Sequence, residues 1–138
     1  MKSKTTCAVV SGNKNETRLE IAAKIEKLVE NGVTDFLCDC ERGFPLTVAE
    51  VVIGLRDARK SQGLNTPRLC VVAPHEEQTT DWDEDSRDRY YAVHEQADEV
   101  LFLQAHFSDG CHERCEQYMI DNSDFVLREE AFAGAAGG

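Results

Sequence analysis

Short apolar runs, separated by turn residues, recur along the chain. They are rich in Val, Leu, Phe and Cys and show no polar alternation, which is typical of strands buried on both faces of a parallel sheet. Five such runs predict strands at residues 7–10, 33–38, 68–74, 100–103 and 125–127.

Between these runs, apolar residues recur at helical spacing. A helix is predicted at residues 18–30, because Thr17-x-x-Glu20 forms a capping box before it and Asn31-Gly32 is a strong stop after it. A second capping box, Thr47-x-x-Glu50, predicts a helix that runs to about residue 60. Further helices are predicted at 87–96 and 111–121, and the acidic segment 75–86 is expected to be a long loop over one edge of the sheet.

The alternation of strand and helix predicts the fold class. It indicates a three-layer α/β domain with a mostly parallel five-stranded sheet and helices on both faces. Residues 1–130 are assigned to a single domain, and residues 131–138 to a flexible tail. Ligands of such sheets bind outside the carboxyl ends of the strands, so the segments that follow the strands are expected to hold any site.

Net charge argues against some classes of partner, and the N-terminal segment and the cysteines bear on the cellular compartment. The chain of 138 residues has 26 acidic and 15 basic side chains and a formal charge of -11, which argues against nucleic acid and anionic membranes as partners. The N-terminal segment has too few apolar residues for a signal sequence, so a cytoplasmic location is predicted. In that compartment the six cysteines are expected to be reduced thiols. No cofactor is predicted.

Several stretches, taken in order, carry a family resemblance. They are "TCAVVSG", "DFLCDCERGF", "VVAPHEEQ", "YYAVHEQADEV" and "YMIDNSDFVL". Together they resemble the YpsA-like branch of the SLOG superfamily over residues 5–127. The resemblance implies a Rossmann-like fold with strand order 3-2-1-4-5. It also implies that the protein binds nucleotides or nucleotide-derived ligands.

The ligand-binding motifs of that family are degenerate in this chain. The family's Gly-His-Arg-Pro is "GNKN" at residues 12–15, and its Gly-Gly-Ala-x-Gly-x-Asp is "DCERGFP", in which only Gly43 remains of three glycines. Bare glycine backbone lets a phosphate approach, whereas Asp39 and Glu41 would repel it. Two unit charges about 4 Å apart repel by roughly 4 kcal/mol at an effective dielectric constant near 20. We therefore predict weakened phosphate binding.

The resemblance supplies the candidate ligand-binding residues: Gly12, Asn13, Gly43, Thr47, Gln78 and Trp82. The backbone N–H groups of the two glycines would meet polar atoms, Trp82 would stack on a base, and Gln78 would form hydrogen bonds. The favoured interpretation is a non-enzymatic protein that binds a nucleotide-like small molecule.

Two alternatives remain open. The first is a nucleotide N-glycosidic hydrolase, similar to the LOG enzymes, with Glu50 as the catalytic acid, although a capping box explains Glu50 more simply. The second is a protein-interaction module that has lost its ligand, with a homodimer or another protein as partner.

A metal site is a weaker hypothesis. Cys38 and Cys40 end one strand, and Cys111, His112 and Cys115 begin a helix, so these residues could converge on one edge of the sheet as a zinc or redox site. Buried cysteine, however, more often behaves as a small hydrophobic residue. The histidines at positions 75, 94, 106 and 112 are scattered and are expected to be solvated or to lie in loops.

Overall fold

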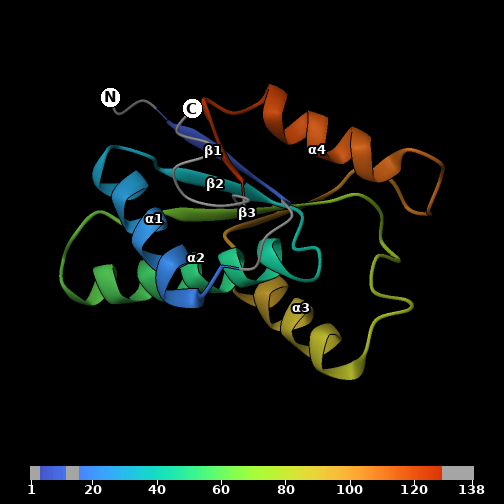
Figure 1. Ribbon diagram of the computed structural model, residues 1–138, viewed down its shortest axis with the longest axis horizontal. Helices are drawn as coiled ribbons and strands as arrows, with labels where there is room; N and C mark the ends of the chain where they lie inside the picture. The colour runs from blue at the N-terminus through green and yellow to red at the C-terminus, as the bar shows by residue number, and fades with distance from the viewer. Residues whose placement is uncertain (1–3, 12–15, 129–138) are drawn as a thin grey trace.

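The computed structural model describes residues 4–11 and 16–128. Five strands form one sheet that is parallel throughout, and four helices connect them (Figure 1). The strands are β1 (Thr6–Val10), β2 (Asp35–Cys38), β3 (Arg68–Ala73), β4 (Glu99–Phe102) and β5 (Phe125–Arg128). The helices are α1 (Arg18–Glu30), α2 (Phe44–Ser61), α3 (Glu84–Gln96) and α4 (Cys111–Asp121). The three-layer α/β prediction is confirmed. The predicted tail at 131–138 and the candidates Gly12 and Asn13 lie outside the described residues.

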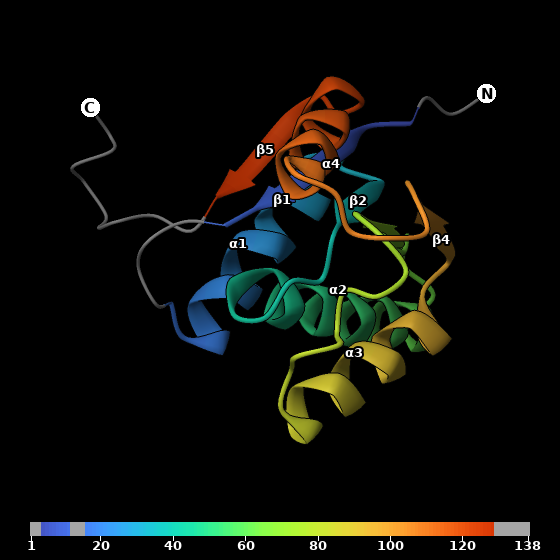
Figure 2. The ribbon, with the colours of Figure 1, turned by 90° about the vertical axis from the view of Figure 1, so that its right-hand side faces the viewer.

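The helices are divided unequally between the two faces of the sheet. Figure 2 shows α1, α2 and α3 below the sheet and α4 alone above it. The larger core lies on the three-helix face, where α1 buries a stripe of Ile21, Ile25 and Val29. A smaller cluster, which includes Cys115 and Met119, packs α4 against the other face. Burial of each such apolar side chain contributes about 1.5–3 kcal/mol to folding.

The predicted strand order, 3-2-1-4-5, is wrong, because the observed order is β4-β3-β2-β1-β5. Asp98, just before β4, holds this strand beside β3. Its carboxylate accepts a hydrogen bond from the Leu69 backbone N–H at 2.8 Å. Residues just before β5 fix it beside β1 in the same way. The Asp124 carboxylate accepts from the Thr6 N–H at 2.9 Å, and the Asp124 N–H donates to the Thr6 carbonyl at 2.8 Å.

The observed order also explains why α4 is alone on its face. The chain adds β2, β3 and β4 in one direction across the sheet, and the connection through α4 then returns to β1. Crossover connections between parallel strands share one hand, so a reversal of direction moves the connecting helix to the opposite face.

The first helix begins as the sequence predicts, whereas the second and third do not. In α1 the capping box is present, since the Thr17 hydroxyl accepts from the Glu20 N–H and the Glu20 carboxylate accepts from the Thr17 N–H. Helix α2 begins earlier than expected, at Phe44, so Thr47 lies inside the helix and Thr47-x-x-Glu50 is not a capping box.

Helix α3 begins at Glu84, because the Asp83 side chain caps it by accepting a hydrogen bond from the Ser86 N–H. The predicted loop at 75–86 is therefore shorter. Within the part of the chain that the structure describes, no helix is both long and apolar enough to cross a membrane.

Candidate functional site

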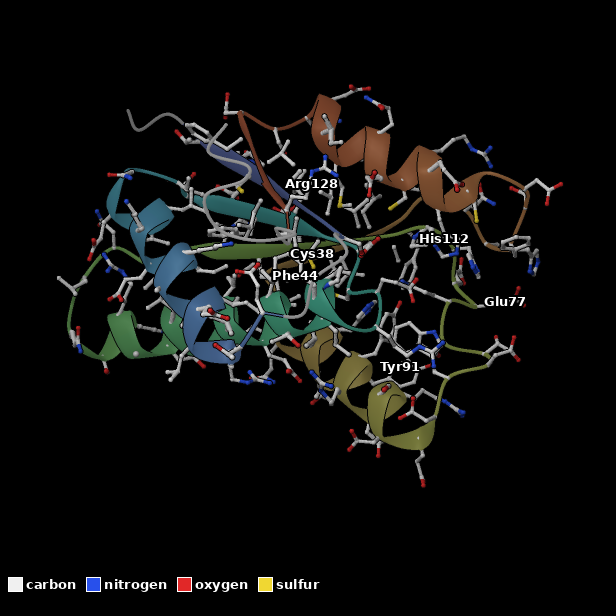
Figure 3. All side chains as sticks on the ribbon, viewed as in Figure 1. Cys38, Phe44, Glu77, Tyr91, His112 and Arg128 are labelled. Carbon is white, nitrogen blue, oxygen red and sulfur yellow. The ribbon has the colours of Figure 1, made fainter. Side chains whose placement is uncertain are left out.

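A cavity of about 410 Å³ lies at the carboxyl edge of the sheet, and we call it the strand-end cavity. Three segments that follow neighbouring strands line it. Figure 3 shows two of its residues on this edge, His112 at the start of α4 and Glu77 in the segment after β3. The full lining is Glu41, Arg42, His75, Glu77, Gln78, Thr80, Asp81, Trp82, Phe107 and His112.

The turn after β2 forms one wall of the cavity and needs unusual backbone angles. Cys40 has a φ of 61° and Gly43 a φ of 94°, both in the left-handed region. The Asp39 carboxylate stabilises the turn by accepting a hydrogen bond from the Glu41 N–H at 3.0 Å. Gly43 then caps α2 with its backbone alone, so the conformational need for glycine at this position is confirmed.

Gln78 holds the turn after β2 against α3. Its side-chain nitrogen donates to the Asp39 carbonyl at 3.1 Å and to the Glu41 carboxylate at 3.4 Å, and its side-chain oxygen accepts from the Tyr90 hydroxyl at 2.9 Å. Both of its N–H groups are therefore engaged within the protein. Gln78 is among the residues that line the cavity, and its hydrogen bonds also give it a supporting role in the structure.

Trp82 also lines the cavity, with only 6% of its surface exposed. Its ring system meets Tyr90 in a T-shaped contact, with ring centroids 5.3 Å apart at an interplanar angle of 82°. The Arg42 guanidinium lies over the Trp82 ring, 5.2 Å from the centroid, in a cation–π contact. A base can stack on that face only after the half-exposed Arg42 side chain moves aside.

The charged side chains of the cavity lining are mainly acidic. Glu41, Glu77 and Asp81 contribute carboxylates, and Arg42 is the one arginine in the lining. Burial raises the pKa of the adjacent Asp39 to about 7, despite the hydrogen bond from the Glu41 N–H. Near neutral pH Asp39 therefore carries only part of a charge. The sequence analysis expected a full negative charge on both Asp39 and Glu41, and this expectation needs correction for Asp39. Glu41 is therefore the main source of repulsion for a phosphate in this turn.

Glu50 lies apart from this cavity, in a clamp of two arginines. Arg89 donates to both of its carboxylate oxygens, at 2.8 and 2.9 Å, and Arg18 donates to one of them at 2.8 Å. Burial acts to raise the pKa of Glu50, but the hydrogen bonds and charges of the two arginines outweigh it and lower the pKa. Glu50 is therefore ionised at neutral pH and lacks the proton that a catalytic acid must donate. Thr47 lies beside this clamp, 3.5 Å from Arg89, and is not among the cavity residues.

The four cysteines that the sequence marked as metal candidates do not share one site. Cys38 donates to the Pro45 carbonyl at 3.1 Å, and Cys115 donates to the Val72 carbonyl at 3.2 Å, so both are packed as buried thiols. Burial raises the pKa of Cys115 well above its usual range. Cys111 instead lies with His75 and His112, and one candidate ligand atom from each of the three lies within 4.8 Å of the others.

Sequence reasoning named His112 beside Cys111 but gave His75 no role. His75 lies in the loop after β3, yet only 5% of its surface is exposed, because Phe107 and His112 pack around its ring. Its position in the sequence could have indicated a place at the site. His75 follows a buried strand by two residues, and the carboxyl edge of the sheet lies where that strand ends. Phe107 and Arg42 were also missed, and both sit in exposed turns without a distinctive pattern.

Comparison with known proteins agrees with this architecture. A family model described as the YspA SLOG family matches residues 15–129. Among curated proteins, the chain is 28% identical over 109 residues to UPF0398 proteins of Staphylococcus aureus strains JH9, Mu3 / ATCC 700698 and COL. Each match covers 78% of this chain and 56% of the relative, so the chain spans about half the length of the curated relatives it matches.

Proposed function

This chain belongs to the YspA SLOG family, and on that premise we propose that it binds a nucleotide-derived small molecule in the strand-end cavity without hydrolysing it. The observation that carries the proposal is the cavity itself. It opens at the carboxyl ends of parallel strands, where α/β proteins of this kind bind ligands, and three successive strand-end segments line it.

The lining favours the ring and sugar of a nucleotide over its phosphates. Trp82 and Phe107 offer aromatic surface, and Phe107 is 58% exposed and free to contact a ring. Glu41 and Asp81 can accept hydrogen bonds from ribose hydroxyls or from the amino group of a base. These carboxylates repel a phosphate inside the cavity, so the phosphates of a ligand are expected to point toward solvent or toward Arg42.

The two-arginine clamp argues against hydrolysis by Glu50. A catalytic acid must be protonated when the reaction begins, and catalytic carboxyl groups of this kind have raised pKa values. Glu50 has the opposite shift, and its carboxylate oxygens already accept hydrogen bonds from Arg18 and Arg89. We infer that Glu50 joins α1, α2 and α3 and plays no chemical role.

A thermal-shift panel tests the binding proposal. The purified chain would be heated with adenosine, AMP, ADP and ADP-ribose, each with and without prior treatment with a metal chelator. A ligand present at 100 times its dissociation constant should stabilise the fold by about 2.7 kcal/mol. Phe107→Ala should weaken the shift, because it removes exposed ring surface from the cavity and leaves the core unchanged.

Glu50→Gln is the matched control. It should leave ligand binding unchanged, and neither the wild type nor this variant should release free base from the bound compound. The absence of a shift with every compound would contradict binding. Base release that disappears in Glu50→Gln would favour the hydrolase instead.

A second candidate function is protein interaction, favoured by the outer edge strand. Within the described residues β4 pairs only with β3, and its Val100, Leu101 and Phe102 are 39–44% exposed. Exposed apolar edge strands can pair with a further chain. Light scattering on the purified chain tests this candidate, and a mass that stays monomeric at high concentration would reject self-association.

A further inference from the structure

Three potential metal ligands converge at one wall of the strand-end cavity. His75 follows β3, and Cys111 and His112 begin α4, and one ligand atom from each lies within 4.8 Å of the other two. We propose that His75, Cys111 and His112 form a binding site for a divalent transition-metal ion of the zinc type. This proposal does not require nucleotide binding, because it depends only on these three side chains and their neighbours.

The donor set selects the class of metal. Two imidazoles and one thiolate suit Zn²⁺ and its spectroscopic substitute Co²⁺, whereas Mg²⁺ and Ca²⁺ prefer oxygen ligands. At Zn–N and Zn–S bond lengths of about 2.0–2.3 Å, tetrahedral ligand atoms are roughly 3.3–3.6 Å apart. The side chains therefore need to close by about 1 Å around the ion, which rotation of the half-exposed His112 can supply.

The surroundings hold the two imidazoles in place. Only 5% of the surface of His75 is exposed, because the rings of Phe107 and His112 pack against it. Beside the other imidazole, an oxygen of the Glu41 carboxylate lies 3.6 Å from His112 Nδ1. A small movement makes this a hydrogen bond that holds the proton on Nδ1 and leaves Nε2 for the metal, an arrangement common around zinc.

One existing contact must break when the metal binds. Nδ1 of His75 accepts a hydrogen bond from the Glu77 backbone N–H at 3.2 Å. A metal at Nδ1 would replace that hydrogen bond directly, and a metal at Nε2 would require the proton to move to Nδ1. In both cases the Glu77 amide loses its hydrogen-bond acceptor. Metal binding can therefore be detected at the Glu77 amide, although Glu77 is not one of the three proposed ligands.

Three protein ligands leave a coordination position open. Structural zinc sites usually have four protein ligands, whereas sites that bind water or another molecule have three. His75 and His112 both line the cavity, so the open position is within reach of whatever enters it. A bound ion would also add positive charge to a cavity that now has three carboxylates in its lining.

Co²⁺ and Zn²⁺ titrations of the chelator-treated full chain, without nucleotide, test the proposal. We expect one equivalent of Co²⁺ to bind with the visible absorption of a tetrahedral site and a thiolate-to-metal charge-transfer band, and Zn²⁺ should displace it. His112→Gln should weaken binding at least tenfold, and Cys111→Ser should remove the charge-transfer band. In ¹⁵N-labelled protein, the Glu77 amide resonance should shift when Zn²⁺ is added.

Matched variants distinguish this site from adventitious binding. His106→Gln removes an exposed histidine from the same edge, and Cys115→Ser removes a thiol one helical turn further along α4, so both should bind metal like the wild type. Unchanged affinity in His112→Gln would overturn the proposal. A charge-transfer band that survives in Cys111→Ser, or an unmoved Glu77 resonance, would also overturn it. His112 is half-exposed, so its variant should fold even if Cys111→Ser does not.

Discussion

The raised pKa of Asp39 should make the fold less stable as the pH rises, and Asp39→Asn should abolish that effect. The ordinary pKa of Asp is 3.8, and in the folded protein it is about 7. The stabilisation from a protonated Asp39 is complete below pH 3.8 and is lost as the pH rises through 7. A difference of about three pKa units corresponds to roughly 4 kcal/mol, and solvent around this half-buried group makes that an upper limit.

Asparagine is a close replacement, because its side-chain oxygen can still accept the hydrogen bond from the Glu41 N–H. It is neutral at every pH, as protonated Asp39 is. The two proteins should therefore have similar stability near pH 4, and Asp39→Asn should be the more stable by up to a few kcal/mol at pH 7.5.

Urea unfolding at pH 4.5, 6 and 7.5 measures this difference directly. All other titrating groups are shared by the two proteins, so they cancel when the free energies are subtracted. A difference that stays constant with pH would refute the assignment of a raised pKa to Asp39.

Three further predictions concern stability. Burial lowers the pKa of His94 to about 4 from 6.5, so His94 itself should contribute a loss of at most about 2 kcal/mol between pH 7.5 and 5, because its ring is partly exposed; in the same urea assay the wild type should lose this much relative to His94→Phe. Gly43→Ala should cost about 1–2 kcal/mol in thermal unfolding, because only the φ of 94° opposes it, whereas Gly54→Ala, inside α2, should stabilise. Asp98→Ala should cost about 1–3 kcal/mol and raise amide exchange in β4, and unchanged exchange would contradict its anchoring role.

Local signals predicted much of the fold. The apolar runs identified all five strands, and the capping box at Thr17 placed the start of α1. The start of α2 was missed, because Gly43 caps it through the backbone and leaves no side-chain signature, while Thr47-x-x-Glu50 imitates a capping box. The strand order was missed because it depends on contacts between distant residues, such as Asp98 with Leu69, that no local pattern reveals.

The error in strand order also hid the meeting of His75 with Cys111. In the predicted order, β3 and β4 are three strand spacings apart, about 14 Å, so His75 and Cys111 would not be expected to meet. In the observed order the two strands are neighbours, and the segments that follow them converge. Gln78 and Trp82, which the resemblance supplied as candidate ligand-binding residues, lie in the cavity lining, but residues in exposed loops such as Phe107 had no signal in the sequence.

The position of β5 has a consequence for how the chain folds. Strands β2, β3 and β4 each join the sheet beside the strand that precedes them, so this part can assemble from contacts between consecutive units. The pairing of Asp124 with Thr6 spans 118 residues and must pay the entropy of closing nearly the whole chain. We expect β5 to dock last, which leaves the first strand with a bare edge until residues 125–128 have been made and makes that interval a time when the protein is exposed to aggregation.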